Sequence, residues 1–429
     1  PDVFEDFFLK HNKNVKDCYD LLKLDPGFSI YYEDKERFDV PESFEELVKV
    51  FESIENGSGK SLEKFINRAE KKYEIGVKNL VYKPSKSIFE FLNLKVLKGA
   101  FHLDIFTVFS KYIRKYFKHP KLVKLMEFPI LFLGALPSNT PAMYSLMNYS
   151  ALKQGTYYPI GGFFSVIDAL VKIAQEKGVN FHYDAEITKL NVSNRLVDYL
   201  EINDKKFQVD IVVAGADYHH VEKNLLTEKY RNYNDKYWDS RKLAPSSLLF
   251  YIGVDKKLVD VNHHTLFFDE DFSVHADEIY KDPKWPTSPL FYMSCPSVTD
   301  KTIAPNGMEN LMLLIPLAPG LKDTEEMREK YFNIMLKRIK SLTANDISKN
   351  IVYKRSYCVR DFEKDYHAFK GNAYGLANTL DQTAILKPSL RNKKLKNLFY
   401  TGQLTVPGPG VPPSIISGQV VASEINKYF

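Results

Sequence analysis

The sequence lacks long hydrophobic runs and is poor in cysteine. No stretch of about 18 consecutive apolar residues occurs, so the sequence predicts no membrane-spanning helix, and it shows no signal peptide. The three cysteines, Cys18, Cys295 and Cys358, lie far apart, which excludes a disulfide framework and a paired-thiolate metal site. Such a pattern is typical of reduced thiols in a cytoplasmic protein.

Common catalytic and nucleotide-binding motifs are missing as well. The sequence contains no HExxH, no C-x₂-C pair, no G-x-S-x-G and no phosphate-binding P-loop. Two adjacent histidine pairs, His219–His220 and His263–His264, are poorly placed for metal binding, because neighbours in sequence rarely point at one ion. We therefore predict no metal site and no single catalytic side chain. If the protein is an enzyme, a cofactor carries its chemistry.

The composition that is present is aromatic-rich and mildly basic. Hydrophobic residues make up 44% of the 429 residues, with 30 Phe and 27 Tyr, and the net charge is +5. This length suits two domains or one large two-part fold. A charge of this size permits contact with an anionic membrane surface and gives no reason to expect a nucleic-acid partner.

The most informative segment is the C-terminal one, residues 397–429. A short apolar strand, Leu398–Tyr400, leads into Gly402, and six of the seven residues from Pro407 to Pro413 are Pro or Gly. Such a backbone is stiff and nearly free of side chains, which suits a chain that lies flat against a ligand. A helix is predicted from Ser414 to about Tyr428. Its interior Gly418 suggests a close neighbour.

A second informative segment spans residues 157–217. Gly161 and Gly162 precede an amphipathic helix predicted at 164–177, and three short strands are predicted at 180–183, 186–191 and 196–202. The segment 209–217 reads as a buried strand that ends in small residues. Small residues at the carboxyl end of a buried strand leave room for a ligand.

Both segments resemble the phytoene desaturase family of carotenoid enzymes. The C-terminal one is similar to that family's flavin-binding signature, and the other to its glycine-led helix and to its strand ending in Ala-Asp. The matching residues are Gly161, Gly162, Ala169, Leu170, Ala216, Asp217, Gly402, Pro407, Gly408, Gly410, Val411 and Pro412.

The resemblance implies FAD as the cofactor and assigns residues to two sites. The cofactor-binding residues would be Gly161, Gly162, Gly402, Gln403, Pro407, Gly408, Gly410, Val411 and Pro412. The substrate-lining residues would be Gly371, Asn372, Ala373, Tyr374 and Gly375, which are similar to the family's segment near the reactive face of the flavin. The implied substrate is a lipophilic carotenoid, and a quinone or oxygen would accept the electrons.

The implied fold is an α/β flavoprotein with two dinucleotide-binding domains and an α+β substrate domain. Strands predicted at 248–254, 265–268, 290–294, 310–316 and 350–358, with a helix at 323–342, describe that substrate domain. We predict FAD-binding segments at 157–245 and 386–429 and an antiparallel substrate domain at 246–385. Residues 81–156 form a helical region associated with substrate and membrane. Residues 1–80 lie at the interface between the FAD and substrate domains.

A basic aromatic stretch, residues 95–124, is the predicted membrane contact. Leu103, Phe106, Phe109, Ile113 and Phe117 form an apolar stripe, and six basic residues with no acidic one lie between Lys111 and Lys124. An apolar face with a cationic flank is how a helix lies in a membrane interface. A core helix with a solvated charged face has the same pattern and stays an alternative. The predicted location is the cytoplasmic face of the membrane, as a peripheral protein.

The dinucleotide-binding turn G-x-G-x-x-G is absent from the sequence. Since the resembled family has this turn near its start, we expect an N-terminal βαβ unit of roughly 60 residues to precede Pro1. The leading prediction is FAD-dependent desaturation of phytoene towards lycopene. The alternatives are a carotene cis–trans isomerase of the same family and a peripheral membrane protein that binds a polyene without chemistry.

Overall fold

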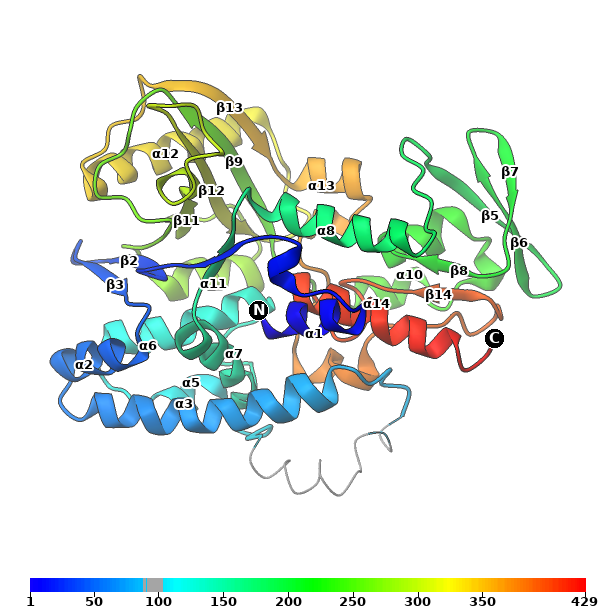
Figure 1. The fold of residues 1–429 in the computed structure, drawn as a ribbon, viewed down its shortest axis with the longest axis horizontal. Helices are drawn as coiled ribbons and strands as arrows, with labels where there is room; N and C mark the ends of the chain where they lie inside the picture. The colour runs from blue at the N-terminus through cyan, green and yellow to red at the C-terminus, as the bar shows by residue number, and fades with distance from the viewer. Residues whose placement is uncertain (88–89, 91–102) are drawn as a thin grey trace.

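The computed structural model describes residues 1–87, 90 and 103–429. Figure 1 shows a large sheet at the upper left, a layer of helices beneath it, and a mixed α/β region on the right that holds the C-terminus. Chain segments alternate between these regions, so the candidate site is assembled from residues far apart in sequence.

The large sheet has seven strands in the order β13-β9-β12-β11-β10-β2-β3. Their bounds are β2 Phe28–Tyr32, β3 Arg37–Val40, β9 Ser246–Val254, β10 His264–Phe268, β11 Phe291–Ser294, β12 Glu309–Leu317 and β13 Ile351–Tyr357. All neighbours pair antiparallel except β10 and β2, which are parallel. The hairpin β2–β3 thus extends a sheet whose other strands come from the middle of the chain.

The inner strand β10 is buried on both faces, because successive side chains of a strand point to opposite faces and its residues 265–268 are all buried. Phe267 packs in one cluster with Met335 of α12 (Glu325–Thr343), while its neighbours Leu266 and Phe268 pack in another. The second cluster joins the sheet to helices α2 (Phe44–Ile54), α3 (Ser58–Ile75), α5 (Phe109–Ile113) and α6 (Pro120–Glu127). Continuous apolar strands are expected in a sheet covered on both sides.

The predicted apolar stripe is part of this core. Leu103, Phe109, Ile113 and Phe117 are at most 1% exposed, which corrects the expectation that they face lipid, whereas Phe106 is 97% exposed. The core alternative therefore holds for these four side chains, because α2 and α3 provide the apolar surface that they cover. Residues 95–102 of the stretch lie outside the described residues. No helix among the described residues is long and apolar enough to cross a membrane.

Several of the basic side chains are paired rather than free. Lys121 forms ion pairs with Asp34 and Glu36, and Lys124 lies 2.6 Å from Glu33. These pairs bind α6 to the turn between β2 and β3. The basic run therefore also serves to hold the helical layer against the sheet.

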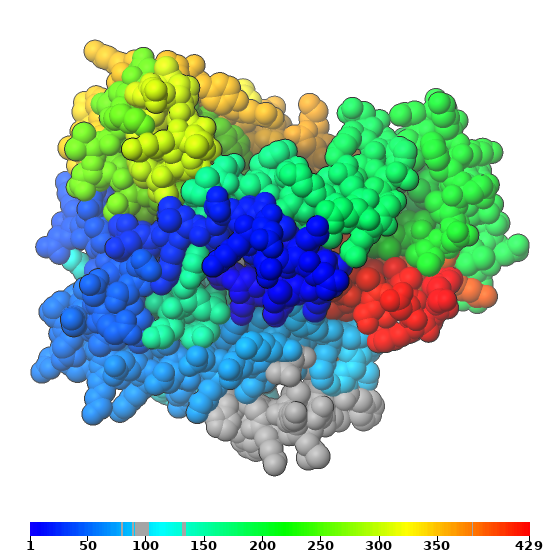
Figure 2. Space-filling view, viewed as in Figure 1, coloured from blue at the N-terminus to red at the C-terminus, as the bar shows by residue number. Residues whose placement is uncertain are grey.

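The α/β region contains two small sheets. Strands β8 (Val212–Ala214) and β14 (Leu398–Tyr400) form a parallel pair, and β5 (Ile187–Ser193), β6 (Leu196–Ile202) and β7 (Lys205–Gln208) form an antiparallel sheet. Helix α1 (Asp2–Lys10) lies between α8 (Phe163–Glu176) and α14 (Val411–Ile425), as Figures 1 and 2 show. Phe8 of α1 packs with Val166 and Ile173 of α8.

The remaining strands and α-helices of the described residues have at most nine residues each. They are β1 Leu21–Lys23, β4 Tyr157–Pro159, α7 Leu146–Tyr149, α9 Tyr218–His220, α10 Asp235–Asp239, α11 Phe272–Tyr280 and α13 Val359–Tyr366. Strand β4 pairs antiparallel with β1, and the turn that follows it leads into α8.

Four sequence predictions in the α/β region are wrong in detail. Residues 180–183 form no strand, since no described strand pairs with them and Tyr183 is 76% exposed. Only 212–214 of the predicted strand at 209–217 is extended and paired. The last helix begins at Val411 rather than Ser414, because two prolines fit its first turn. A Cβ added at Gly418 would meet nothing within 4 Å, so no close neighbour explains that glycine.

Candidate flavin and substrate site

The Pro/Gly loop ahead of α14 exposes its backbone. Gly402, Gly408 and Gly410 have φ of 100°, 134° and 116°, conformations that residues with a Cβ rarely adopt. Gly410 is the N-cap of α14 and makes no side-chain cap hydrogen bond. The residues just before the helix, 407–410, are all Pro or Gly, so the positive end of the helix dipole meets backbone there, an arrangement that favours a negatively charged or carbonyl-bearing ligand.

Ser417 fixes this loop to the helix. The Ser417 hydroxyl accepts a hydrogen bond from Thr401 Oγ1 at 2.9 Å and another from the backbone N–H of Gly402 at 3.1 Å. It is fully buried. These two hydrogen bonds connect the turn after β14 to the buried face of α14. Sequence reasoning missed Ser417, and its only signal was a polar residue on the inner face of an otherwise apolar helix.

The predicted substrate segment contacts the predicted cofactor segment. Asn372 Oδ1 accepts hydrogen bonds from Gly375 N at 2.7 Å and from Gln403 Nε2 at 3.4 Å. A Cβ added at Gly375 would lie 2.7 Å from the carbonyl oxygen of Gln403. The structure therefore brings residues 371–375 against the loop that follows β14.

Asp217 ties the end of β8 to the same place. Its carboxylate accepts hydrogen bonds from His220 N at 3.0 Å and from Phe369 N at 3.2 Å. Burial raises the pKa of Asp217 to about 6, although these backbone donors act in the opposite direction. The carboxylate thus caps α9 and holds the entry to the segment 371–375.

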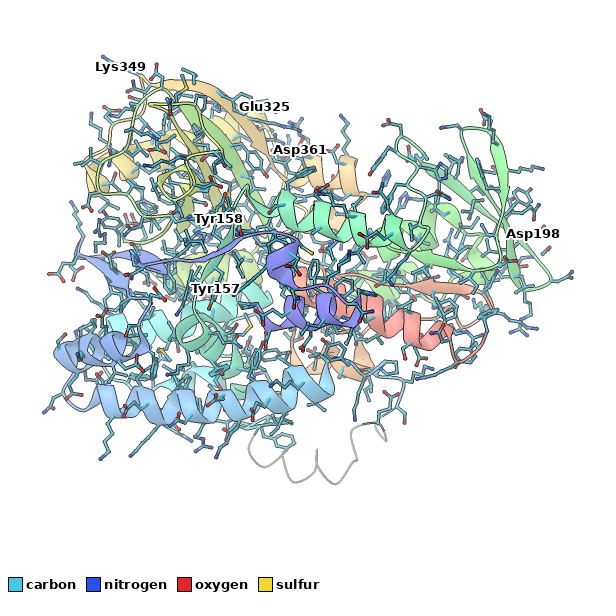
Figure 3. All side chains as sticks on the ribbon, viewed as in Figure 1. Tyr157, Tyr158, Asp198, Glu325, Lys349 and Asp361 are labelled. Carbon is cyan, nitrogen blue, oxygen red and sulfur yellow. The ribbon has the colours of Figure 1, made fainter. Side chains whose placement is uncertain are left out.

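Gly161 and Gly162 lie at the N-terminal end of α8 and have φ of 84° and 82°. The backbone N–H of Gly161 donates to Asp300 Oδ2 at 2.7 Å, and the hydroxyl of Tyr158, which Figure 3 labels, donates to the same oxygen at 3.2 Å. The described contacts connect Gly161 to the loop of Asp300 and Gly162 to Pro159 and Ser165, and neither glycine to residues 402–412. Sequence reasoning missed this contact.

The pKa of Asp300 follows from its surroundings. Burial by itself would raise that pKa, but hydrogen bonds from Thr302, Gly161 and Tyr158 outweigh it and hold the pKa below the ordinary value. Thr302 donates to Asp300 Oδ1 through both its hydroxyl, at 2.6 Å, and its backbone N–H, at 2.9 Å. An ionised Asp300 is therefore the junction between the substrate sheet and the turn before α8.

The residues present fit a flavin. A flat ring system needs backbone without side chains, and the carboxyl ends of β8 and β14 provide it, since Gly215 follows β8 directly and Gly402 lies two residues after β14. The uncapped N-terminus of α14 suits the oxygen-bearing edge of such a ring. Gly402, Gly408, Gly410 and Val411 are the residues that would hold it.

Comparison with known proteins agrees with this geometry. Residues 26–426 match the family described as flavin containing amine oxidoreductase. The chain is 38% identical over 428 residues to a carotenoid 3,4-desaturase of Haloarcula japonica, covering 99% of this chain and 86% of that protein. It is 29% identical over 437 residues to a 4,4'-diapophytoene desaturase (4,4'-diaponeurosporene-forming) of Staphylococcus haemolyticus, covering 99% and 87%. The structure of an oxidoreductase from Methanosarcina mazei aligns with a TM-score of 0.59 at 13% identity, covering 95% and 82%.

Fold, loop and relatives together define an FAD-dependent oxidoreductase that acts on CH–CH groups. The predictions of a flavoprotein fold and of FAD as the cofactor are confirmed. More particularly, the chain belongs to the flavin containing amine oxidoreductase family, in its carotenoid desaturase branch. The resemblance inferred from the two sequence segments is thereby confirmed, while the roles of the single residues stay predictions.

Proposed function

We propose that the protein desaturates an acyclic carotenoid with FAD as the oxidant. The observation that carries the proposal is the loop 402–410, whose glycines at 402, 408 and 410 have positive φ; it leads into α14 and contacts the segment 371–375. When bound, FAD supplies a two-electron acceptor: a hydride leaves one carbon of a CH–CH unit, a proton leaves the other, and a C=C bond forms.

The residues of the chain position the reactants. Glycines at 402, 408 and 410 let a ring approach the backbone closely, and the N-terminus of α14 stabilises negative charge on it by about 1 kcal/mol. The contact of Asn372 with Gln403 keeps the predicted substrate segment at a constant distance from the predicted cofactor segment. Holding two reactants in a fixed orientation accelerates a reaction without an acid–base side chain.

The bond that is oxidised is a finer question. Identity to the carotenoid 3,4-desaturase is 38%, against 29% to the diapophytoene desaturase, which favours a 3,4-desaturation of a partly conjugated carotenoid. Desaturation of phytoene towards lycopene is the second candidate, supported by the resemblance of residues 402–412 to that family's loop. A quinone or oxygen is the proposed electron acceptor.

The test uses the full-length chain with FAD in liposomes, supplied either with phytoene or with lycopene and with a quinone or oxygen. A product lighter by two hydrogens per step is expected, and the substrate that gives it decides the oxidised bond. Isomerisation at constant mass would support the isomerase alternative, and retention of unchanged carotenoid would support the binding protein. Gly410→Leu should abolish the product, whereas Gly307→Leu, with a similar φ of 80° and nothing within 4 Å, should not.

We also propose that the protein works as a peripheral protein at the cytoplasmic face of a membrane, where a carotenoid is dissolved. Support comes from Phe106, which is 97% exposed, from the exposed Lys111 on α5, and from the exposed Lys115 in the turn after that helix. Phe106→Ser combined with Lys115→Glu should reduce sedimentation with anionic vesicles. Equal sedimentation of the double variant and the unchanged protein would place the membrane contact elsewhere.

A further inference from the structure

Two buried polar side chains near the Pro/Gly loop have no partner. Lys387, which follows the turn 384–386, is 5% exposed, and its ammonium makes no hydrogen bond or ion pair among the described residues. Asn378 is also 5% exposed, and its Oδ1 is unpaired. Burying an unpaired ammonium is costly, so proteins keep one where a ligand completes it.

Both side chains converge on one glycine of the flavin loop. A Cβ added at Gly408 would lie 3.4 Å from Lys387 Nζ, 3.3 Å from Asn378 Oδ1 and 3.5 Å from Asn378 Nδ2. Gly408 carries no side chain and has φ of 134°. The ammonium and the amide therefore pack against the buried backbone of Gly408, in the loop predicted to hold the cofactor.

The surroundings leave the charge of Lys387 uncompensated. Burial alone lowers the pKa of Lys387 to about 8, and no carboxylate or other titratable group shifts it. A hydrocarbon substrate has neither a hydrogen-bond acceptor nor a negative charge that could pair with an ammonium. A ring with carbonyl oxygens offers acceptors, and a ring that gains negative charge on reduction offers a counter-charge.

We propose that Lys387 and Asn378 form a subsite for a carbonyl oxygen of the flavin ring, in which the Lys387 ammonium stabilises the negative charge of the reduced cofactor. This inference rests on the proposed function, because it takes the loop 402–410 as the flavin site. Lys387 acts on the reduction potential through charge, and Asn378 orients the ammonium and the ring.

The test measures the midpoint potential of FAD in the FAD-loaded full chain. Lys387→Met should lower the ratio of reduced to oxidised flavin at a fixed potential about tenfold, which corresponds to roughly 30 mV for a two-electron couple. Lys387→Arg should restore most of the difference, because it keeps the charge. Lys396→Met, which removes an exposed lysine on the same stretch of chain, is the matched control and should leave the potential unchanged.

Several outcomes would overturn the proposal. A flavin potential that is the same in Lys387→Met and in the unchanged protein contradicts it. Slower reoxidation by a quinone at an unchanged potential would assign the subsite to the electron acceptor instead. If Lys387→Met fails to retain FAD, Asn378→Ala keeps the ammonium and should bind FAD about tenfold more weakly; unchanged affinity overturns the proposal. Failure of the proposed function differs from all of these, since it would appear as normal flavin potentials with no carotenoid product.

Discussion

At the scale of single residues, Gly375 is the tightest contact between the two parts of the site. Its φ is 77°, and an added Cβ would lie 2.7 Å from the carbonyl oxygen of Gln403, which is backbone and cannot move aside cheaply. Gly307 has a similar φ of 80° with nothing within 4 Å. Comparing substitutions at Gly375 and Gly307 therefore separates the free-energy cost of placing a side chain at positive φ from the cost of its steric contact with Gln403.

We predict that Gly307→Ala lowers the free energy of unfolding by about 1–2 kcal/mol, from positive φ alone. Gly375→Ala should lower the free energy of unfolding by at least about 1 kcal/mol more than Gly307→Ala does, because the Gln403 backbone must shift. Urea denaturation of both variants measures the difference. Equal losses would mean that the close approach at Gly375 does not constrain the loop.

Lys387 predicts a pH dependence of stability in the FAD-free protein. Its folded pKa of about 8 lies below the ordinary 10.5, so the folded state disfavours the proton. Below pH 8 the ammonium is present in both states and its burial costs on the order of 3 kcal/mol. Between pH 8 and 10.5 the unfolded chain binds more protons than the folded one, so the stability of the unchanged protein rises with pH.

Lys387→Met should therefore be more stable than the unchanged protein at pH 7, by up to about 3 kcal/mol, and this advantage should vanish as the pH approaches 10.5. Chemical denaturation at several pH values, without FAD, measures it. A constant difference across that range would mean that the ammonium is compensated in solution.

At the scale of elements, Asp300 decides how β4 and α8 meet the substrate sheet. It is 3% exposed and accepts hydrogen bonds from Gly161, Tyr158 and Thr302. We predict that Asp300→Asn lowers the free energy of unfolding by about 1–3 kcal/mol at pH 7, because an amide cannot accept all of these bonds. Tyr158→Phe keeps the Gly161 bond and is the milder control.

The sign of the pH effect follows from the lowered pKa of Asp300. Its contribution is fully present above the unfolded value of about 3.8 and is lost as the pH falls through the lower folded value. The gap between the unchanged protein and Asp300→Asn should therefore shrink in acid. A gap that is independent of pH would mean that the charge of Asp300 is unimportant and that the loss comes from packing.

At the scale of the whole molecule, the contacts Gly161–Asp300 and Phe369–Asp217 couple the α/β region to the seven-stranded sheet. The chain has two tryptophans, one in each region, so their fluorescence reports the two regions separately. Trp238 is buried and packs with residues of β14. Trp285 stacks on Tyr331 of α12, with 5.0 Å between the ring centroids. Ligand binding to the folded state at 100 times its Kd adds about 2.7 kcal/mol to stability.

We predict that FAD shifts the unfolding of both regions together in the full-length chain. Trp238→Phe and Trp285→Phe leave one fluorescent probe each, and urea unfolding with and without FAD should show the same shift for both probes. A shift confined to the Trp238 probe would show that the substrate sheet unfolds independently of the flavin site.

The sequence alone determined those features that depend on neighbours in the chain. The loop 402–413 was predictable because Pro fixes its φ and Gly permits positive φ, and the strands of the large sheet were predictable because their apolar patterns are local in sequence. The class of cofactor followed from the same loop and its resemblance.

Only the tertiary structure decided what depends on segments meeting across the chain. The strand predicted at 180–183 is absent because strands need partners, and Phe109, Ile113 and Phe117 of the predicted stripe are core because residues of α2 and α3 pack with them. Because lysine is usually exposed, nothing in the sequence indicated that Lys387 is buried beside Gly408. Hydrogen bonds such as Gly161–Asp300, 139 residues apart, depend on where two separate elements come to rest, and that is decided by packing.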